Sequence, residues 1–351
     1  MGKPIYGLGE FSQLPEVEGE RLPSISIVIP TYNSQQYLPE CLKSILAQDY
    51  PRSKIEIIIA DGGSSDNTLE IARNAGVDII ANNPLKTGEA GKAVGVKKAQ
   101  NDIIALIDSD NILPEKSWLR KMVWPFIEDR EIVATEPLYY TYRETDPVLT
   151  RYSALLGMND PLCLFLGNYD RYCVLTGKWT NLHVPQVDQG NYIKVSLGKE
   201  VPTIGANGFM IKRNLVSDVG DYLFDIELLG NIISIGQNKV AKVKIGIVHL
   251  YGKDSEDFKR KQRRRINDYL LFKSRGLRKY PWLVKRNKLQ IMKFIVYTVT
   301  TIPLLLQALS GYAKFRDDSW KFHVIACWLT LMIYAKGAMR SGTDQTAPKS
   351  N

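Results

Sequence analysis

Two carboxylates, Asp108 and Asp110, stand one residue apart at the end of an apolar run in this chain. The run, Ile-Ile-Ala-Leu-Ile at residues 103–107, predicts a short buried strand. Alternate residues of an extended segment point the same way, so both carboxylates can approach one cation. Hard oxygen ligands beside an open position suit Mg²⁺ or Mn²⁺ that also holds substrate phosphates. Asp, Ser and Asn are also ordinary turn residues, so the pattern equally fits a strand followed by a solvated turn.

Three further apolar runs precede this strand and alternate with helical patterns. The runs are residues 26–30, 56–60 and 77–81, and the helical patterns are residues 37–47, a helix opening near Asp66, and residues 89–100. Short apolar strands that alternate with helices are typical of an α/β domain with a mostly parallel sheet covered on both faces. Ligands of such sheets bind outside the carboxyl ends of the strands, where Tyr32, Asn33, Asp61 and Asp108 stand.

The second half of this domain has a weaker pattern. Residues 136–201 are rich in Tyr, Asn, Gly and Pro, and we expect an irregular lid or binding region there. Two readable elements follow, a small-residue segment at 202–212 and a helix that opens near Asp225. A last strand over residues 243–249 ends at His249.

Composition places the chain among globular proteins, since 44% of its 351 residues are hydrophobic and 24% are charged. The net charge of +9 is concentrated between residues 253 and 293, where 15 Lys and Arg face four Asp and Glu. The rest of the chain is therefore almost neutral. A nucleic acid is a poor partner for this segment because aromatic residues are few there and an apolar region adjoins it. Anionic membrane lipids explain the charge better.

Two apolar stretches, residues 294–309 and 322–335, follow the basic segment and are separated by a charged connector at 314–318. Each is near the lower limit of the ~17–25 residues that span a bilayer. The stretches predict either a spanning hairpin or a buried or interfacial helix pair, and the preceding basic segment favours contact with the cytoplasmic face of a membrane. The expected divisions are an N-terminal extension (1–23), a catalytic domain (24–252), a basic amphipathic juxtamembrane segment (253–292), a two-helix membrane hairpin (293–338) and a flexible tail (339–351).

Three motifs in order carry a family resemblance: Pro-Thr-Tyr-Asn at 30–33, Asp-Gly-Gly-Ser-Ser-Asp-Asn-Thr at 61–68 and Asp-Ser-Asp at 108–110. From about residue 24 to 249 the chain resembles the GT-A glycosyltransferases, most closely the membrane-associated, inverting members of family 2. The resemblance implies a Rossmann-like nucleotide-sugar-binding domain, a nucleotide-diphosphate-sugar donor and a Mg²⁺ or Mn²⁺ cofactor. The residues it assigns to the donor are Pro30, Tyr32, Asn33, Asp61, Asp108 and Ser109, and those it assigns to the metal are Asp108, Asp110 and His249.

The remaining roles are less uniquely determined by the sequence. Lys92 either adds a positive charge to the donor phosphates or is a solvated helix residue. The resemblance matches Asp225 to the base that deprotonates the acceptor hydroxyl and Glu227 to a second acid, although Phe224 replaces the usual Glu. Asp225 could instead simply cap a helix, and a phosphate acceptor would need no base. His249 could likewise be a structural histidine.

Two further groups of residues follow from the same resemblance. Gly205, Asn207 and Gly208 lie in the acceptor-side segment, where small residues let a sugar approach the backbone. Gln262 and Arg265 stand where membrane-bound relatives carry a Gln-x-x-Arg motif near the donor phosphates. The Trp that follows in those relatives is Ile266 here, and a headgroup-facing helix would explain the same charges.

The sequence therefore predicts a metal-dependent glycosyltransferase at the cell membrane, with its catalytic domain on the cytoplasmic face. We expect a lipid-linked, glycan or other membrane-proximal acceptor, as in the synthesis of an envelope polysaccharide or glycolipid. A polyprenyl-phosphate glycosyl synthase of the same fold is the nearest alternative. A metal-dependent nucleotidyltransferase would bring a Gly-rich basic loop after the first strand, and a haloacid-dehalogenase-type phosphatase would carry its Asp pair on that strand. A non-catalytic lipid-binding protein remains open.

Overall fold

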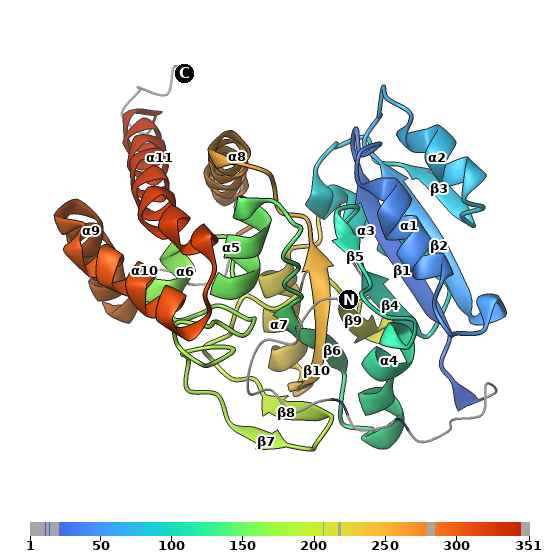
Figure 1. Ribbon diagram of the computed structural model, residues 1–351. Helices are drawn as coiled ribbons and strands as arrows, with labels where there is room; N and C mark the ends of the chain where they lie inside the picture. Colours follow the sequence, from blue (N-terminus) through green and yellow to red (C-terminus); the bar gives the residue numbers. More distant parts are fainter. Residues whose placement is uncertain are drawn as a thin grey trace. The chain divides into compact units, whose positions relative to one another are not determined.

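The computed structural model describes residues 11, 14, 21–205, 207–216, 219–278 and 285–344 (Figure 1). The chain forms two compact units. One, the sheet unit, comprises Met1–Arg143 and Leu182–Leu250, and the other, the helical unit, comprises Glu144–Asn181 and Tyr251–Asn351. Residues 144–181, expected inside the catalytic domain, thus group with the C-terminal part of the chain. Contacts such as that of the Thr150 hydroxyl with the Gly252 carbonyl, at 2.9 Å, explain this grouping.

The four apolar runs of the first third form four parallel strands of the sheet unit, in the order β3-β2-β1-β4. These strands are β1 (Ile25–Thr31), β2 (Ile55–Asp61), β3 (Ile79–Asn82) and β4 (Ile103–Leu106). The parallel arrangement was predicted, and it brings the polar residues that follow β1, β2 and β4 to one edge of the sheet.

The sheet continues beyond β4 with mixed strand directions. The further strands are β5 (Asn111–Ile112), β6 (Ala134–Tyr140), β7 (Gln186–Asp188), β8 (Tyr192–Ser196), β9 (Phe209–Lys212) and β10 (Lys239–His249). Strand β9 runs antiparallel between β4 and β6, and β6 is parallel to β10. The short β5 pairs with the end of β10, so that Asn111 lies opposite His249. The expectation of a long irregular segment over 136–201 was therefore wrong in part, because β7, β8 and most of β6 lie within it.

Helices pack on this sheet and on one another. Those of the sheet unit are α1 (Leu38–Leu46), α2 (Thr68–Asn74), α3 (Gly88–Lys98), α4 (Trp118–Glu128) and α7 (Asp225–Ser234), with 3₁₀ turns at Arg52–Lys54 and Arg213–Leu215. The N-cap of α2 is Asn67, one residue later than Asp66, the residue expected to open the helix. The Asp66 carboxylate instead accepts a hydrogen bond from the backbone N–H of Thr68.

Helix α3 lies close to β1 because two of its residues are glycines. A Cβ at Gly95 would lie 2.2 Å from Cγ1 of Val28, and one at Gly91 would lie 2.7 Å from Cβ of Pro30. The two glycines are one helical turn apart, so both face the strand. Close approach here positions the side chains of α3, including Lys92, at the sheet edge.

The helical unit consists of α5 (Val148–Leu156), α6 (Leu162–Leu166), α8 (Ser255–Ser274), α9 (Lys285–Thr300), α10 (Ile302–Lys314), a 3₁₀ turn at Asp318–Lys321, and α11 (Phe322–Asp344). The first apolar stretch, expected as one helix of a hairpin, is broken into α9 and α10, which meet at an angle of 91°. Thr301, at the break, has a φ of +62°.

Within the described part of the chain, Asp318–Met339 is the one segment long and apolar enough to cross a membrane, and 39% of its most apolar window is buried in the protein. The bent pair of α9 and α10 adds a second crossing only if its two arms are counted as a single span. Both helices of the expected hairpin are thus present, but only one is continuous.

The packing of α3 on β1 generates a prediction. Gly95→Ala should lower the free energy of unfolding by up to about 2 kcal/mol, because overpacking typically costs about 1–3 kcal/mol and better helix propensity returns about 1 kcal/mol. Thermal denaturation followed by circular dichroism measures the change. Gly88→Ala is the control on the same helix, since a Cβ there meets no atom within 4 Å. Equal melting temperatures for the two variants would contradict the close packing.

Candidate functional site

The Asp61 carboxylate organises the loop at the end of β2. Its Oδ1 accepts hydrogen bonds from the hydroxyls of Thr31 (2.9 Å) and Ser64 (2.6 Å), and its Oδ2 accepts from the backbone N–H groups of Gly63 and Ser64 at 2.9 and 2.8 Å. The residue is only 4% exposed. Asp61 therefore joins the ends of β1 and β2, a structural role that the sequence did not show.

The loop after β1 is held in place by hydrogen bonds to the loop after β2. Asn33 adopts a φ of +49°, its side-chain oxygen accepts from the N–H of Ser65 at 2.9 Å, and its own N–H donates to the Ser64 hydroxyl at 2.8 Å. Tyr32, between Pro30 and Asn33, leaves its side chain 55% exposed. The loop is thus fixed by hydrogen bonds while one aromatic ring remains open to a ligand.

The Asp-Ser-Asp motif follows β4 at the same edge of the sheet. The Ser109 hydroxyl donates to the Ser34 hydroxyl at 3.1 Å, which joins this motif to the loop after β1. Oδ2 of Asp110 lies 3.5 Å from Nε2 of His249, and the ring of His249 packs against Tyr140 with centroids 5.5 Å apart. The pairing of β5 with β10 produces this proximity, because it places Asn111 opposite His249.

The three predicted metal ligands do not form one cluster in the structure. Among the residues that the structure describes, no three or more His, Cys, Asp and Glu side chains form a group that could hold a metal ion. Asp110 and His249 lie next to one another, with Oδ2 of Asp110 3.5 Å from Nε2 of His249. A carboxylate beside an imidazole still fits a cation whose remaining ligands are substrate phosphates and water, since Mg²⁺ is commonly held by one or two carboxylates.

Asn111 is a residue that the sequence did not single out. It is fully buried, its Oδ1 accepts from the N–H of Asp108 at 3.0 Å, and its Nδ2 donates to Oδ1 of Asn207 at 3.0 Å. Asn207 in turn donates to the Tyr140 hydroxyl at 3.2 Å. Its place directly after Asp110 was the available signal. Asn111 thereby links the carboxylate motif to the segment at 205–208.

Lys92 and Asp225 form an ion pair at this site. The Lys92 Nζ lies 3.0 and 3.3 Å from the two carboxylate oxygens, and the side chains are 9% and 27% exposed. The interpretation of Lys92 as a solvated helix residue was therefore wrong. Burial raises the pKa of Asp225 to about 6, although the charge of Lys92 opposes the shift.

The charge of Lys92 is itself stabilised by several carboxylates. Burial alone lowers the pKa of Lys92, but the negative charges of Asp225 and then Asp108 outweigh it and raise the pKa above its usual value. Lys92 is therefore charged at neutral pH. Its charge interacts both with Asp225, the expected base, and with Asp108 of the expected metal motif.

Asp225 is the first residue of α7, and its N-cap is Phe224. The interpretation of Asp225 as the helix cap was thus wrong by one residue. An acidic residue in the first turn is favourable near the positive end of the helix dipole, and Glu227 shares that turn. Gly205 makes room for Asp225: its φ is +130°, and a Cβ there would lie 2.3 Å from Cβ of Asp225.

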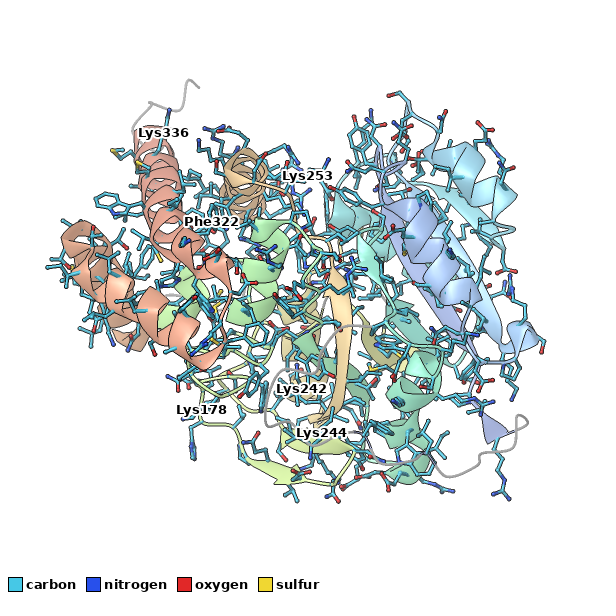
Figure 2. All side chains as sticks on the ribbon, in the orientation of Figure 1. Lys178, Lys242, Lys244, Lys253, Phe322 and Lys336 are labelled. Carbon is cyan, nitrogen blue, oxygen red and sulfur yellow. The ribbon has the colours of Figure 1, made fainter. Side chains whose placement is uncertain are left out.

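A buried ion pair supports Gly205 from inside the sheet. Nζ of Lys242, on β10, lies 2.5 Å from Oε2 of Glu136, on β6, and both side chains are fully buried (Figure 2). Oε1 of Glu136 accepts a hydrogen bond from the N–H of Gly205 at 3.0 Å. The sequence did not single out this pair, and the available signal was Glu136 as the one charged residue of the apolar strand β6.

Gly208, expected to leave space for a sugar, has a packing role. Its φ is +92°, and a Cβ there would lie 2.9 Å from Cδ1 of Ile247 and 3.1 Å from atoms of Pro137 and Trp118. A side chain at this position would therefore meet three neighbours. The acceptor role of Gly205, Asn207 and Gly208 stays a prediction.

Gln262 and Arg265 lie on α8 of the helical unit. The fully buried Gln262 side chain donates to the Asn159 carbonyl at 2.9 Å and accepts from Nη1 of Arg265 at 2.8 Å and from the Tyr334 hydroxyl at 2.9 Å. These contacts give Gln262 a structural role within its unit. The expected contact of both residues with donor phosphates stays a prediction.

A family model described as Glycosyl transferase family 2 matches residues 26–215. The chain is 28% identical over 142 residues to the glycosyltransferase AglE of Haloferax volcanii, a match that covers 39% of this chain and 46% of that protein. It is 33% identical over 105 residues to the dolichyl N-acetyl-alpha-D-glucosaminyl phosphate 3-beta-D-2,3-diacetamido-2,3-dideoxy-beta-D-glucuronosyltransferase of Methanococcus voltae, covering 28% of this chain and 32% of that protein. The chain thus spans less than half the length of these relatives.

A solved structure shows a similar fold. The mannosyltransferase PcManGT from Pyrobaculum calidifontis, solved in complex with GDP-Man and Mn²⁺, aligns with a TM-score of 0.50 at 14% sequence identity. The alignment covers 91% of this chain and 88% of the mannosyltransferase.

The buried ion pair beneath Gly205 generates a prediction for stability. Lys242→Met should lower the free energy of unfolding by about 3–5 kcal/mol, because it leaves the Glu136 carboxylate buried without its partner charge. Combining it with Glu136→Gln should recover most of that loss. Urea denaturation of both variants measures the difference.

Lys244→Met is the matched control, two residues along β10 (Figure 2). Lys244 pairs with Asp188, whose side chain is 62% exposed, so this variant should lose at most about 1 kcal/mol. A loss for Lys242→Met no larger than that of Lys244→Met would show that the buried pair does not support the fold.

Proposed function

Because the chain belongs to glycosyl transferase family 2 and has the α/β, GT-A fold that its sequence predicts, we propose that it is an active inverting glycosyltransferase. It moves a sugar from a nucleotide-diphosphate-sugar to a lipid-linked or other membrane-proximal glycan acceptor, with the help of Mg²⁺ or Mn²⁺. The observation that carries the proposal is the Lys92–Asp225 pair, which stands at the sheet edge within electrostatic range of Asp108.

The donor nucleotide is assigned to the loops after β1 and β2. The exposed ring of Tyr32 offers a flat surface to a base, and Asn33 and Asp61 hold the surrounding backbone in place. Pro30 and Ser109 border the same loops. Gln262 and Arg265 are assigned to the donor phosphates from the family resemblance alone.

Asp110 and His249, with Asp108 nearby in sequence, are the residues that would hold the divalent cation. When bound, the cation would neutralise the charge that grows on the departing nucleoside diphosphate. The mannosyltransferase of Pyrobaculum calidifontis, whose structure contains GDP-Man and Mn²⁺, is consistent with such a donor and metal. The side chains of this chain supply two carboxylates and one imidazole toward that function.

Asp225 is the proposed base that accepts the proton of the acceptor hydroxyl. Its pKa of about 6 keeps it largely ionised at neutral pH while leaving it more basic than a solvated carboxylate. Lys92 holds the carboxylate in position at 3.0 Å and favours its charged form. Glu227, in the same turn, is a second acid on the acceptor side, and Gly205, Asn207 and Gly208 form the segment against which the acceptor would rest.

The acceptor and location are proposed from the composition and from relatives. The protein of Methanococcus voltae carries in its name a dolichyl-linked acceptor, and the apolar C-terminal region of this chain suits a substrate that lies in a membrane. We place the catalytic domain on the cytoplasmic face of the cell membrane, in the synthesis of an envelope polysaccharide or glycolipid.

A polyprenyl-phosphate glycosyl synthase is the second candidate, because the same fold would serve it and a phosphate acceptor is already an anion. The two candidate functions differ in whether transfer requires the ionised form of Asp225. A hydroxyl acceptor requires its carboxylate, whereas a phosphate acceptor does not.

The pKa of Asp225 therefore yields a prediction. For a hydroxyl acceptor, kcat/KM should rise as the pH increases through about 6, because the carboxylate is the active form and the acid is inactive. Lys92→Met removes the charge that lowers the pKa of Asp225, so the rising limb should move to higher pH. The measurement is the pH profile of kcat/KM for both proteins.

Lys97→Met is the control on the same helix, since Lys97 is 44% exposed and pairs with Asp221, which is 78% exposed. Its pH profile should match that of the unaltered protein. A rate that is flat between pH 5 and 8 in all three proteins would rule out Asp225 as the base and favour a phosphate acceptor.

Sugar transfer itself is tested with labelled UDP-, GDP- and dTDP-sugars and membranes that contain the protein. We expect label from one donor in extracted lipid, its loss with chelator and its return with Mg²⁺ or Mn²⁺. Asp110→Asn should lower the rate about 100-fold or more, since charge stabilisation of the leaving group is removed.

Asp49→Asn is the matched control, because the Asp49 carboxylate is 69% exposed and pairs with Arg120 outside the site. It should transfer sugar at the unaltered rate. Undiminished transfer by Asp110→Asn would refute the metal assignment, and release of free sugar alone from every donor would refute the acceptor.

A further inference from the structure

An exposed apolar surface covers one side of helices α9 and α10 in the helical unit. Its members are each 45–67% exposed and recur at intervals of three or four residues, so they share one face of each helix. They are Leu289, Met292, Val296 and Val299 on α9 and Ile302, Leu305, Leu306, Leu309 and Tyr312 on α10. We call this set the outer apolar face. The opposite sides of the two helices are buried, as Phe294 and Leu304 show with exposures of 2% and 0%.

The two helices that carry this face contact one another and α11 (Figure 1). Exposed apolar residues scattered singly are normal on a soluble protein, whereas nine grouped on one helix pair are typical of an interaction surface. A surface of this kind is covered by a partner, and the charges around it indicate the chemical nature of that partner.

The charged residues on α9 and α10 are all positive. Lys288 and Lys293 are exposed on the two sides of the apolar stripe of α9, and Arg316 is exposed just after α10. Residues 269–316 contain ten Lys and Arg and no Asp or Glu. Lysines beside an apolar stripe can bury their methylenes and keep their ammonium groups among lipid headgroups. This pattern complements an anionic bilayer surface, where each Lys or Arg contributes about 1 kcal/mol.

Neither arm of the bent pair is long enough to cross a bilayer. Helix α10 has 13 residues, which at 1.5 Å per residue is about 20 Å, against a hydrocarbon core of about 30 Å. Helix α9 has 16 residues, and Lys288 and Lys293 interrupt its apolar sequence. Because the arms meet at 91°, they cannot act together as one straight span.

Helix α11 is long enough, and 39% of its most apolar window is buried, but polar and close contacts tie it to other helices of the unit. The Tyr334 hydroxyl donates to Asp160 at 2.5 Å and to Gln262 at 2.9 Å. A Cβ at Gly337 would lie 2.7 Å from Ile266, so α8 packs closely along the same half of α11. Phe322, at the start of α11, and Lys336, near its other end, are seen in Figure 2.

Helix α8 could not accompany α11 into the hydrocarbon. Its exposed side chains include Arg260, Arg263 and Arg264, and each charged residue at the centre of a bilayer costs about 2.5–3.5 kcal/mol on insertion scales. The first half of α11 is also tied internally, since His323 contacts the Tyr152 hydroxyl at 2.8 Å and Gln307 of α10 at 3.0 Å. Helix α11 is thus tied to α5, α8 and α10 along its length.

From this arrangement we infer that the outer apolar face lies in the headgroup region of an anionic bilayer, as an anchor on one leaflet, and that no helix of the described chain crosses the membrane. Amphipathic helices with basic flanks bind membranes in this way. The inference gives a specific surface to the membrane-proximal acceptor of the proposed function. Vesicle binding needs no donor, metal or Asp225, so the anchor and the transferase can be tested separately.

The first experiment measures co-sedimentation of the full chain with vesicles. Binding should be at least 10-fold stronger to phosphatidylcholine with about 30% phosphatidylglycerol than to phosphatidylcholine alone, and should weaken with salt. Leu305→Glu with Leu309→Glu should reduce binding at least 10-fold without changing the circular dichroism spectrum, because both residues are exposed, at 49% and 65%.

The matched control is Leu46→Glu with Ile235→Glu in the sheet unit. Leu46 and Ile235 are 45% and 65% exposed, which is similar to the exposure of the two altered leucines of α10. This control should bind vesicles as the unaltered chain does. Equal binding by both double variants, or no binding to anionic vesicles, would overturn the inference. Self-association without vesicles that Leu305→Glu with Leu309→Glu abolishes would also overturn it, by making a second copy the partner.

A second experiment distinguishes an anchor on one leaflet from a spanning hairpin. Arg316→Cys, in the connector between α10 and α11, and Lys253→Cys, before α8, are each treated with a membrane-impermeant maleimide after binding to sealed vesicles. Both should be labelled to the same extent above the unaltered chain, whose Cys41, Cys173 and Cys327 are buried. Protection of Arg316→Cys alone would show that the helices cross the bilayer.

Discussion

The buried ion pair of Glu136 and Lys242 is the interaction on which the acceptor side of the site depends. Two opposite charges at 2.5 Å, with no solvent exposure, join β6 to β10. Removing such charges from water is unfavourable, so the pair persists only with complementary contacts. Glu136 uses its second oxygen to hold the backbone of Gly205. Because a Cβ at Gly205 would clash with Asp225, the ion pair, the glycine and the carboxylate form a single positioned unit.

The same site carries an excess of negative charge that Lys92 balances. Asp225, Asp108 and Glu89 all act on the Lys92 ammonium, and Asp225 is shifted toward its neutral form by burial. The Asp225 carboxylate is largely buried, its pKa of about 6 is close to neutral pH, and the Lys92 ammonium orients it. Such a carboxylate is suited to exchanging a proton. The fold thus provides the electrostatic conditions for the proposed base without any group outside the chain.

Local sequence predicted the first third of the fold well because its strands are mostly apolar and its first helix, α1, is amphipathic. The strand β1 and the helix α1 both lie within one or two residues of their expected bounds. Prediction failed where a long-range contact decides structure. Residues 144–181 join the C-terminal part of the chain through bonds such as that of Tyr152 with His323, which are 171 residues apart. The break at Thr301 likewise depends on packing that no local pattern reports.

The sequence by itself determined the order of the motifs, the sheet edge where they meet and the family to which the chain belongs, because residue type and spacing are local properties. It could name Asp108, Asp110, Lys92 and Asp225 as candidates but could not pair them. Only the tertiary structure decided that Lys92 contacts Asp225, that Asp110 stands beside His249, and that Asn111 joins the two sides. Those partners lie up to 139 positions apart, and the register of β5 on β10 and the close packing of α3 on β1 bring them together.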